Sequence, residues 1–461
     1  METYLEKLLS QIRCKKARPY IAEEIRDHIE SQIADNLSEG MAYEEAEKNA
    51  VTDMGDPVEV GISLDRIHKP KIAWKLLVIV GILSLLGILI QQSILRQPGF
   101  QELETWRQEV YRYTTEGFVS CIVIGFLLMC VIYFLDYTLI AKYSRLIGGA
   151  ILILGALRVA GFGGLDFDGI GNWIGFGRLR VAVTSLMMFY VPIYGAILYK
   201  YRNGGVFAMC RAILWMILPV FITSRIPSLG VAVIMMVSML IELTVAVWKG
   251  WFQLPVKKTI IGMWLFFTAA PALLLTVKYA FHMLVPYQEA RIRSYFTASG
   301  DSNYMTSMLH KFNENILLWG NSGKDVVGGL PEFNQDYIFS YILNSYGLLA
   351  GIFVAALLAA LVVFLFGASV RQKNELGMVM GFGCGMIILL NVFLNFAGIF
   401  GWIPLTSTFL PFLSYGRNNI LLCYALVGII LSIYRYKDVY PKKFKASQVS
   451  LQKTITLNLN M

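Results

Sequence analysis

Charged residues are scarce in this sequence. Aspartate, glutamate, lysine and arginine make up 15% of its 461 residues, whereas an ordinary soluble domain has about 25%. Hydrophobic residues account for 56% of the chain. So little charge beside so many apolar residues is not typical of a soluble protein, and the composition predicts a membrane protein with several spans.

Cysteine and histidine are also few, which excludes several kinds of site. The six cysteines form no Cys-x-x-Cys pair and the four histidines are scattered, so neither a zinc site nor a disulfide framework is expected. The first 70 residues are polar and charged, so we expect no cleavable signal peptide. The net charge of +9 comes from short loops and the C-terminal tail, which favours a role in membrane orientation over nucleic-acid binding.

Residues 1–72 differ in character from the rest of the chain. Apolar residues recur there at helical spacing between charged ones, and Asp56-Pro57 has the pattern of a helix start. We interpret this segment as a small cytosolic helical module. Its length is marginal for an independent core, so we expect it to dock on the membrane part or to bind a cytosolic regulator.

Residues 73–436 predict an all-α, polytopic membrane domain of about ten transmembrane helices. Each apolar run is long enough to cross a bilayer as a helix. The expected spans lie near residues 73–95, 117–140, 144–162, 181–200, 206–224, 229–248, 258–283, 336–366, 377–400 and 417–435. A basic tail, residues 437–461, follows the last span.

Lysine and arginine gather in every second loop. The loops after even-numbered spans carry Lys142, Arg145, Lys200, Arg202, Lys249, Lys257, Lys258, Arg371 and Lys373. By the positive-inside tendency, these loops and both chain termini face the cytosol. The long loop near residues 284–335 then lies outside the cell. Because most loops are short, one of this length is a candidate for function.

Five stretches of the sequence carry a family signature. They read NWIGFGRLR at 172–180, IPSLG at 226–230, PYQEARI at 286–292, LPEFNQDYIF at 330–339 and NFAGIFGWIPLTSTFLPFLSYG at 395–416. In this order they resemble the motifs of the SEDS family, which includes RodA, FtsW and SpoVE. Each stretch is weak alone, but their order and spacing identify the chain as a member of that family, and the SEDS fold also has ten spans.

The resemblance implies an activity, a location and partners. SEDS proteins are peptidoglycan glycosyltransferases that polymerise lipid II at the outer face of the bacterial cytoplasmic membrane. Lipid II is a disaccharide-pentapeptide carried on undecaprenyl pyrophosphate. The family works with a class B penicillin-binding protein, which crosslinks the glycan. Its essential acid falls on Asp336 of this sequence, so the resemblance makes Asp336 the expected general base.

The chemistry of that reaction suits an acid at Asp336. A sugar hydroxyl must lose a proton as it attacks an anomeric carbon, and a carboxylate within reach can take the proton. The leaving pyrophosphate requires positive charge, which cations or a divalent metal such as magnesium or manganese could supply. The residues alone favour a simpler interpretation, in which Asp336 is an acid at the start of a helix without a chemical role.

Five further residues are candidates for binding the substrate. Arg291, in the stretch similar to the family's YQxxRI, is expected to contact the pyrophosphate. Lys278, up to two turns below the large loop, could face the same anion or snorkel toward the surface. Glu332 could orient the acceptor, hold a metal or simply face water. Ser414 and Tyr415 lie where the helical pattern breaks, and broken backbone at membrane depth either lines a cavity or is buried.

Several residues of the family pattern are replaced here. The family's QPSE and the lysine after it become AVTS at 182–185 and Met188, and the acid of QPDLG becomes Ser228. The family's Gly-Ser-Ser after SYG becomes RNN at 417–419. These losses motivate a second hypothesis, a non-catalytic scaffold that regulates a penicillin-binding protein. A third is a transporter of lipid-linked precursors, although such proteins usually bind at the bilayer midplane.

Overall fold

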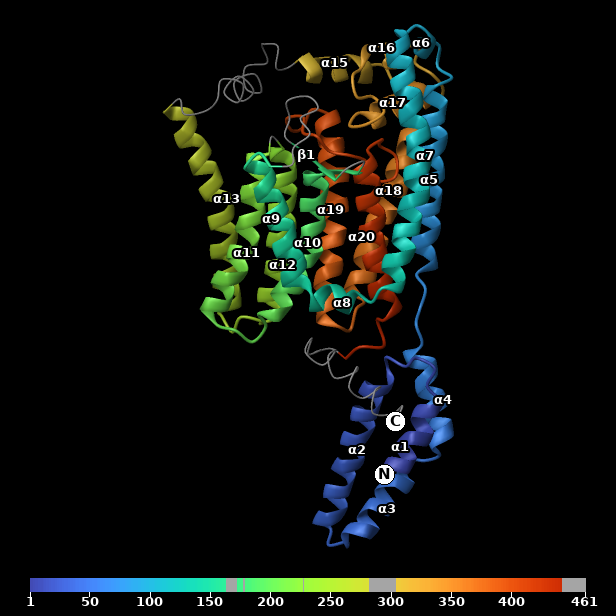
Figure 1. Cartoon of the computed structure of the whole chain (residues 1–461), viewed down its shortest axis with the longest axis vertical. Coiled ribbons are helices and arrows are strands. Elements are labelled where there is room, and N and C mark those ends of the chain that lie inside the picture. The colour runs from blue at the N-terminus through green and yellow to red at the C-terminus, as the bar shows by residue number, and fades with distance from the viewer. Residues whose placement is uncertain (163–171, 177–178, 227, 282–303, 442–461) are drawn as a thin grey trace.

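The computed structural model describes the whole chain except residues 163–171, 177–178, 227, 282–303 and 442–461. The described part consists of helices and one short hairpin (Figure 1). Four helices at the N-terminus form a separate group, and the remaining helices form a bundle above them in this view. We call the end of the bundle that carries α15, α16 and α17 the loop end, and the end facing the N-terminal group the module end.

The N-terminal group forms where the helical module is expected. Its helices are α1 (Glu2–Ser10), α2 (Arg18–Ser38), α3 (Tyr43–Asp53) and α4 (Pro57–His68). Isoleucine recurs at every fourth position of α2, which produces one buried stripe made by Ile21, Ile25, Ile29 and Ile33. Ala46 and Ala50 of α3 are fully buried, and their small side chains let α3 approach α2 closely. The domain boundaries at residues 72 and 436 stay predictions.

The bundle has a helix at each expected span. The long helices are α5 (Trp74–Ile94), α7 (Thr105–Phe134), α9 (Ser144–Val159), α10 (Val183–Lys200), α11 (Val206–Arg225), α12 (Leu229–Trp248), α13 (Val256–Ala280), α18 (Leu348–Val370), α19 (Glu375–Ile399) and α20 (Arg417–Arg435). Nine of them, within the described residues, are long and apolar enough to cross a membrane. The tenth, α9, has 16 residues and rises about 24 Å, less than the roughly 30 Å of a hydrocarbon core.

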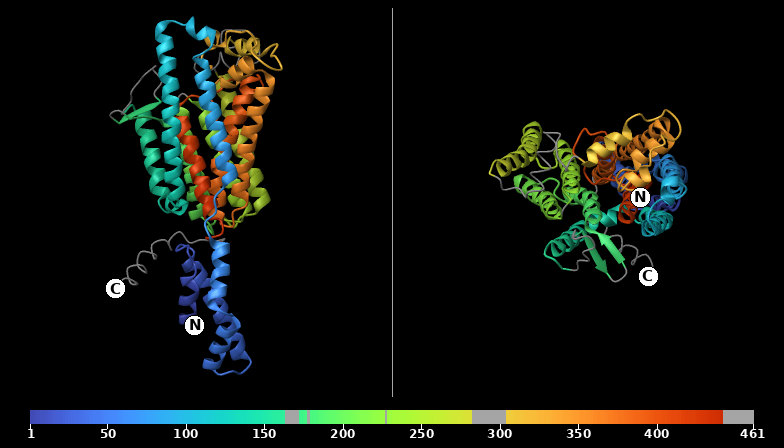
Figure 2. Two further views of the ribbon diagram at one scale, coloured as in Figure 1. Left: turned by 90° about the vertical axis from the view of Figure 1, so that its right-hand side faces the viewer. Right: turned by 90° about the horizontal axis from the view of Figure 1, so that it is seen from above.

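Three helices form the buried centre of the bundle. α10, α19 and α20 are the most buried of the candidate spans, whereas α13 is mostly exposed. Seen from above in Figure 2, α13 and α11 lie to one side, away from α5 and α7. Shorter helices complete the fold: α6 (Pro98–Gln101), α8 (Tyr137–Lys142), α15 (Tyr304–Asn313), α16 (Val326–Gly329) and α17 (Ile338–Tyr346).

The expected span at 336–366 is two helices rather than one. α17 ends at Tyr346 and α18 begins at Leu348, because Gly347 between them has φ of +92°, a conformation that glycine adopts without steric cost. The segment before α16 packs against this break: the Leu348 N–H donates to the Leu317 carbonyl at 2.9 Å. The acids at 332 and 336 therefore precede a short helix that lies outside the spanning segments.

One element departs from an all-helical fold. Strands β1 (Trp173–Phe176) and β2 (Leu179–Ala182) pair antiparallel, with Trp173 opposite Ala182. The hairpin leads directly into α10, and the Val183 N–H donates to the Asn172 carbonyl at 2.9 Å. In Figure 2 the hairpin lies at the edge of the bundle. It sits at the loop end, where its residues contribute to the cavity described next.

Candidate active site

A cavity of about 440 Å³ opens at the loop end of the bundle. Its walls come from the hairpin, from the first residues of α10, α12 and α20, and from the loop at 407–416. Asp336 is the one acid among the described residues that line it, and Arg180 and Arg417 are the cations. The cavity therefore places a single carboxylate within a polar and basic surround.

Asp336 lies in a tight turn just before α17. The Glu332 carbonyl accepts hydrogen bonds from the N–H groups of Gln335 at 2.9 Å and Tyr337 at 3.3 Å. Glu332 itself has φ of +53°, which is uncommon for a residue with a side chain and marks a turn held by its surroundings. α17 begins two residues after Asp336, so the carboxylate lies close to a helix N-terminus, as expected.

Three buried side chains hold the backbone on which Asp336 stands. The Asn395 amide on α19 donates to the Asp336 carbonyl at 2.8 Å, and the Ser414 hydroxyl donates to the Gln335 carbonyl at 2.7 Å. The Gln91 amide on α5 donates to the Asn334 carbonyl at 2.9 Å. Because buried carbonyls without partners are costly, these bonds position the turn relative to two long helices and the 410–416 loop.

The environment of Asp336 changes its acidity. Burial, together with the nearby negative charge of Glu332, raises the pKa of the carboxyl from its usual value near 3.8 to about 7. A hydrogen bond from Ser407 opposes this shift. A carboxyl with a pKa near neutrality exchanges a proton readily at neutral pH, which suits a general base.

Other residues and helix ends in the cavity wall favour negative charge. The N-terminal ends of α10, α12 and α20 all reach its wall, and each such end carries about half a positive charge from the helix dipole. Arg417 is the first residue of α20 and its side chain is exposed. The Ser185 hydroxyl of α10 donates to the Asn419 side-chain oxygen at 2.9 Å, which joins two of these helix ends.

The candidate site residues suggested by the sequence do not all lie in the cavity. Asp336 and Tyr415 line the cavity, whereas Ser414 is buried beneath it and holds the turn. Glu332 is exposed on the turn, and it acts on Asp336 through its charge. Arg291 lies outside the described residues, as does the side chain of Lys278 on α13.

Sequence reasoning treated RNN at 417–419 only as a departure from a pattern, yet all three residues line the cavity. One signal could have pointed to Arg417. The helix dipole disfavours a positive charge in the first turn of a helix, so an arginine there indicates a role that lies outside the helix itself. The roles of Gln91 and Asn395 left no such trace, because they depend on contacts between residues far apart in the chain.

The described residues contain no group of three or more histidine, cysteine, aspartate or glutamate side chains placed to hold a metal ion. Asp336 lines the cavity, and Glu332 lies near enough to influence its charge. Binding of magnesium or manganese stays a prediction, and no step proposed below passes through a metal.

Comparison with known proteins places this geometry in a family. The model of the FtsW/RodA/SpoVE cell cycle proteins matches residues 73–439. A probable peptidoglycan glycosyltransferase FtsW of Enterococcus hirae is 35% identical over 133 residues, which cover 29% of this chain and 33% of that protein. The peptidoglycan glycosyltransferase MrdB of Escherichia coli is 23% identical over 308 residues, covering 63% of this chain and 78% of that protein.

The matched stretches span about a third of the first two curated relatives, at 33% and 34% of their lengths.

Two solved structures share the fold. A chain from a peptidoglycan synthase complex that coordinates polymerisation and crosslinking aligns over 80% of this chain and 98% of its own, with a TM-score of 0.63 and 20% identity. The Thermus thermophilus rod shape determining protein RodA aligns over 79% and 97%, with a TM-score of 0.55 and 18% identity.

The family match covers the whole bundle, and it includes the turn that carries Asp336 and every element that lines the cavity. The fold, the order of motifs and the matched length agree with one another. The chain belongs to the FtsW/RodA/SpoVE family of multi-pass membrane proteins, the SEDS peptidoglycan glycosyltransferase family.

Proposed function

We propose that this chain is a peptidoglycan glycosyltransferase that polymerises lipid II, with Asp336 as the general base. The observation that carries the proposal is the cavity at the loop end, where one carboxylate with a pKa of about 7 shares the wall with Arg180, Arg417 and three helix N-termini. The names of the relatives in Enterococcus hirae and Escherichia coli support the same activity.

The proposed step gives Asp336 and the positive groups of the cavity different roles. A hydroxyl of the acceptor sugar attacks the anomeric carbon of the donor, and its proton passes to the Asp336 carboxylate. The bond between that carbon and the pyrophosphate oxygen breaks, and the oxygen keeps the electron pair. Arg417 and the N-terminal end of α20 then face the negative charge that develops on the leaving group.

The orientation in the membrane follows from the distribution of basic residues. Lys142, Lys200, Lys249 and Lys373 lie at or beyond the helix ends near the module end, so this end is proposed to face the cytosol. The cavity at the loop end would then face outward, where lipid II is polymerised. We further propose a class B penicillin-binding protein as partner, which the likeness to a chain from a synthase complex supports.

The replaced family residues favour a second candidate. Thr184, Met188, Ser228 and Arg417 all line the same cavity as Asp336, so several of the changes lie around the reacting groups. A protein that has lost activity and regulates a penicillin-binding protein would carry changes at this place. However, Asp336 is retained, and its turn is held by hydrogen bonds from buried side chains, which favours the proposal that the chain is an enzyme.

Polymerisation of lipid II by the purified protein tests the proposal. The assay compares the wild type with Asp336→Ala, each with and without a class B penicillin-binding protein of the same organism. Glu314→Gln is a matched control, because Glu314 is an exposed acid at the same end whose ion pair with His310 is also exposed. Glycan strands from the wild type and the control, but not from Asp336→Ala, are expected.

Other outcomes separate the alternatives. Strands from Asp336→Ala at the wild-type rate would remove Asp336 from the mechanism. No strands from any variant with any cognate partner would favour the scaffold. Movement of labelled lipid II across a liposome bilayer without polymer would favour a transporter.

A further inference from the structure

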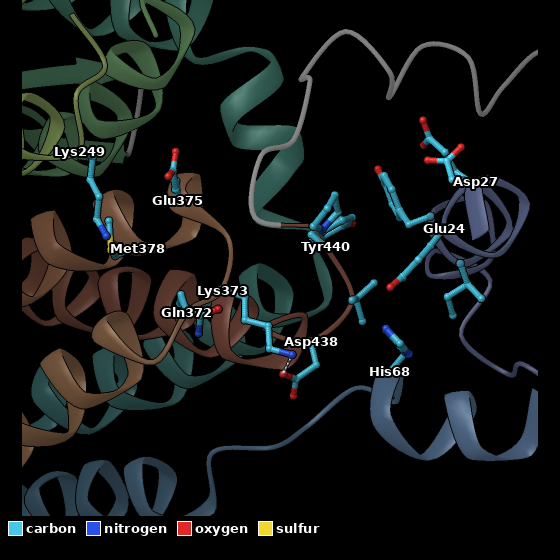
Figure 3. A pocket seen from close by; sticks show the side chains of 15 residues that line it. Glu24, Asp27, His68, Lys249, Gln372, Lys373, Glu375, Met378, Asp438 and Tyr440 are labelled. Carbon is cyan, nitrogen blue, oxygen red and sulfur yellow. Dashed lines mark ion pairs between the residues drawn. The ribbon is translucent and has the colours of Figure 1, made fainter. Parts of the chain in front are cut away.

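A second cavity, larger than the first, lies at the opposite end of the bundle. It measures about 720 Å³ and is bounded by α2 on one side and by the start of α19 and residues 438–441 on the other. We call it the basal cleft. Figure 3 shows Glu24 and Asp27 on the α2 side, with Lys249, Gln372 and Glu375 across the opening. It shares no residue with the cavity of Asp336, so the reaction proposed above does not explain it.

Contacts at its margins hold the two walls of the basal cleft together. Lys16, just before α2, forms an ion pair with Asp136 at 2.7 Å. Lys71, after α4, pairs with Asp438 at 2.7 Å. The rings of Tyr20 and Tyr440 meet edge to face with centroids 5.7 Å apart. The N-terminal module is therefore docked on the bundle, and the basal cleft is a space left open beside this docking.

The acids on the bundle wall of the basal cleft already have partners. Asp438 is paired with Lys71 and lies 3.7 Å from the Lys373 nitrogen. Glu375 lies 3.7 Å from an Arg202 nitrogen and accepts a hydrogen bond from the Trp251 ring at 3.2 Å. The carboxylates of this wall are therefore already paired with cations or hydrogen-bond donors and do not need a further cation.

The α2 wall is different. Glu23, Glu24 and Asp27 line the basal cleft and are exposed, and none of them takes part in an ion pair formed within the described residues. Across the opening, Gln372 is only 7% exposed, and its side-chain oxygen has no hydrogen-bond partner in the described structure. Lys249 and Lys373 also line the bundle wall, so the unmatched acceptors are the three acids of α2 and the Gln372 oxygen. An ammonium-bearing ligand would complement these four groups.

The chain itself brings such donors to this place. Pro441 is the last described residue before the tail, it lines the basal cleft, and its carbonyl accepts a hydrogen bond from the Asn374 amide at 2.7 Å. Lys442, Lys443 and Lys445 follow at once in the sequence. Four extended residues reach about 14 Å at most, so the covalent chain keeps all three lysines near the mouth of the basal cleft.

We propose that the basal cleft is a binding site for a lysine-rich peptide segment and that its occupant is this chain's own segment 442–445, held by Glu23, Glu24 and Asp27. Tethering raises the effective concentration of the segment to the millimolar range, so individually weak ion pairs act together. The segment fastens the N-terminal module to the bundle and leaves it when a competing basic peptide or high salt is present.

Zero-length carbodiimide crosslinking of the purified full-length chain tests this proposal, because it joins lysine amines to carboxylates only where the two already touch. The Lys71–Asp438 and Lys16–Asp136 pairs are positive controls within the same molecule. Mass spectrometry is expected to find Lys442, Lys443 or Lys445 joined to Glu23, Glu24 or Asp27, with yields that fall in high salt. Lys453, farther along the tail, is the negative control.

Mixing chains with normal and heavy nitrogen distinguishes contacts within a chain from contacts between chains. Crosslinks only between chains, or formation of the two control pairs without any link from the tail to α2, would overturn the proposal.

As a second measurement, reversal of all three lysines to glutamate is expected to speed amide exchange in residues 20–27 at least about threefold. Adding Glu23→Lys, Glu24→Lys and Asp27→Lys to this variant should restore the slow exchange of the wild type. Exchange that stays at the wild-type rate in the variant with the three glutamates alone would contradict the proposal.

Discussion

The side chain of Asn395 holds the main chain of Asp336. Its amide nitrogen, on the buried helix α19, donates to the Asp336 carbonyl at 2.8 Å and to the Thr408 carbonyl at 3.2 Å. One amide thus ties the turn that carries the proposed base to the loop that lines the cavity. The geometry of the reacting carboxylate depends on a residue that does not line the cavity itself.

Asn395→Ala is expected to impair activity and stability together. It leaves two buried carbonyls without this donor, which costs about 1–3 kcal/mol of unfolding free energy, and it frees the Asp336 turn, so kcat should fall more than KM rises. Asn391→Ala is the control, because Asn391 is one turn earlier on α19 and donates to Ile387 of its own helix. Thermal unfolding in detergent and lipid II kinetics measure the two effects, and equal losses in both variants would contradict the role of Asn395.

The rate of polymerisation should depend on pH through Asp336. A general base acts when ionised, and the pKa of Asp336 is raised to about 7, so activity is expected to fall about tenfold for each pH unit below that value. Glu332→Gln removes a negative charge that contributes to this shift. The pKa of Asp336 should then fall and the acidic limb should move to lower pH. A pH–rate profile that is identical in both proteins would exclude this coupling.

Arg417→Ala should weaken use of the lipid-linked substrate. Loss of a charged hydrogen bond to pyrophosphate is worth about 1.5–3 kcal/mol, which corresponds to a drop of roughly 10-fold to 150-fold in kcat/KM. Arg417→Lys keeps the charge but not the planar fork and should recover part of the loss. Arg371→Ala at the module end is the control. A kcat/KM for Arg417→Ala equal to that of the control would place Arg417 outside the reaction.

Local sequence patterns predicted the membrane helices well because apolar run length is a local property. Motif order also located Asp336 at the cavity, since that inference needs no knowledge of contacts. The break at Gly347 was missed because the apolar runs on the two sides of Asn344 and Ser345 were joined into one span. The backbone of Leu317 and Trp319, which lies against the glycine, reveals the break. The sequence left open whether Ser414 lines a cavity or is buried. It is buried, and its hydroxyl bonds to a carbonyl 79 positions away, which no local pattern encodes.

Gly347→Ala should be strongly destabilising. A Cβ at this position would lie 2.8 Å from the Trp319 Cα and 2.9 Å from the Leu318 carbonyl oxygen, and the φ of +92° is unfavourable for alanine. Backbone atoms cannot move aside as a side chain can, so the short helix α17 and the Asp336 turn should shift as well. Gly367→Ala on α18, where nothing lies within 4 Å, is the control. Similar unfolding midpoints for the two variants would contradict this account.

Glu242 and Gly383 should be energetically coupled. Glu242 of α12 is fully buried, and both carboxyl oxygens have no hydrogen-bond partner within the described residues. Its carboxyl group occupies the space that glycine leaves open on two neighbouring helices: a Cβ on Gly195 would lie 2.8 Å from one of its oxygens, and a Cβ on Gly383 would lie 2.9 Å from its carboxyl carbon. A methyl group at 383 must therefore displace the acid.

Gly383→Ala should lower the unfolding free energy by about 1–3 kcal/mol through overpacking. Glu242→Ala alone should also destabilise, because it leaves a cavity. The double variant places the new methyl group in that cavity, so it should be more stable than the sum of the two changes predicts, by about 0.5–3 kcal/mol. Gly149→Ala, with nothing within 4 Å, should add independently to either change. Denaturant unfolding of the four proteins and their control measures the coupling, and strict additivity would show that the glycine does not make room for the acid.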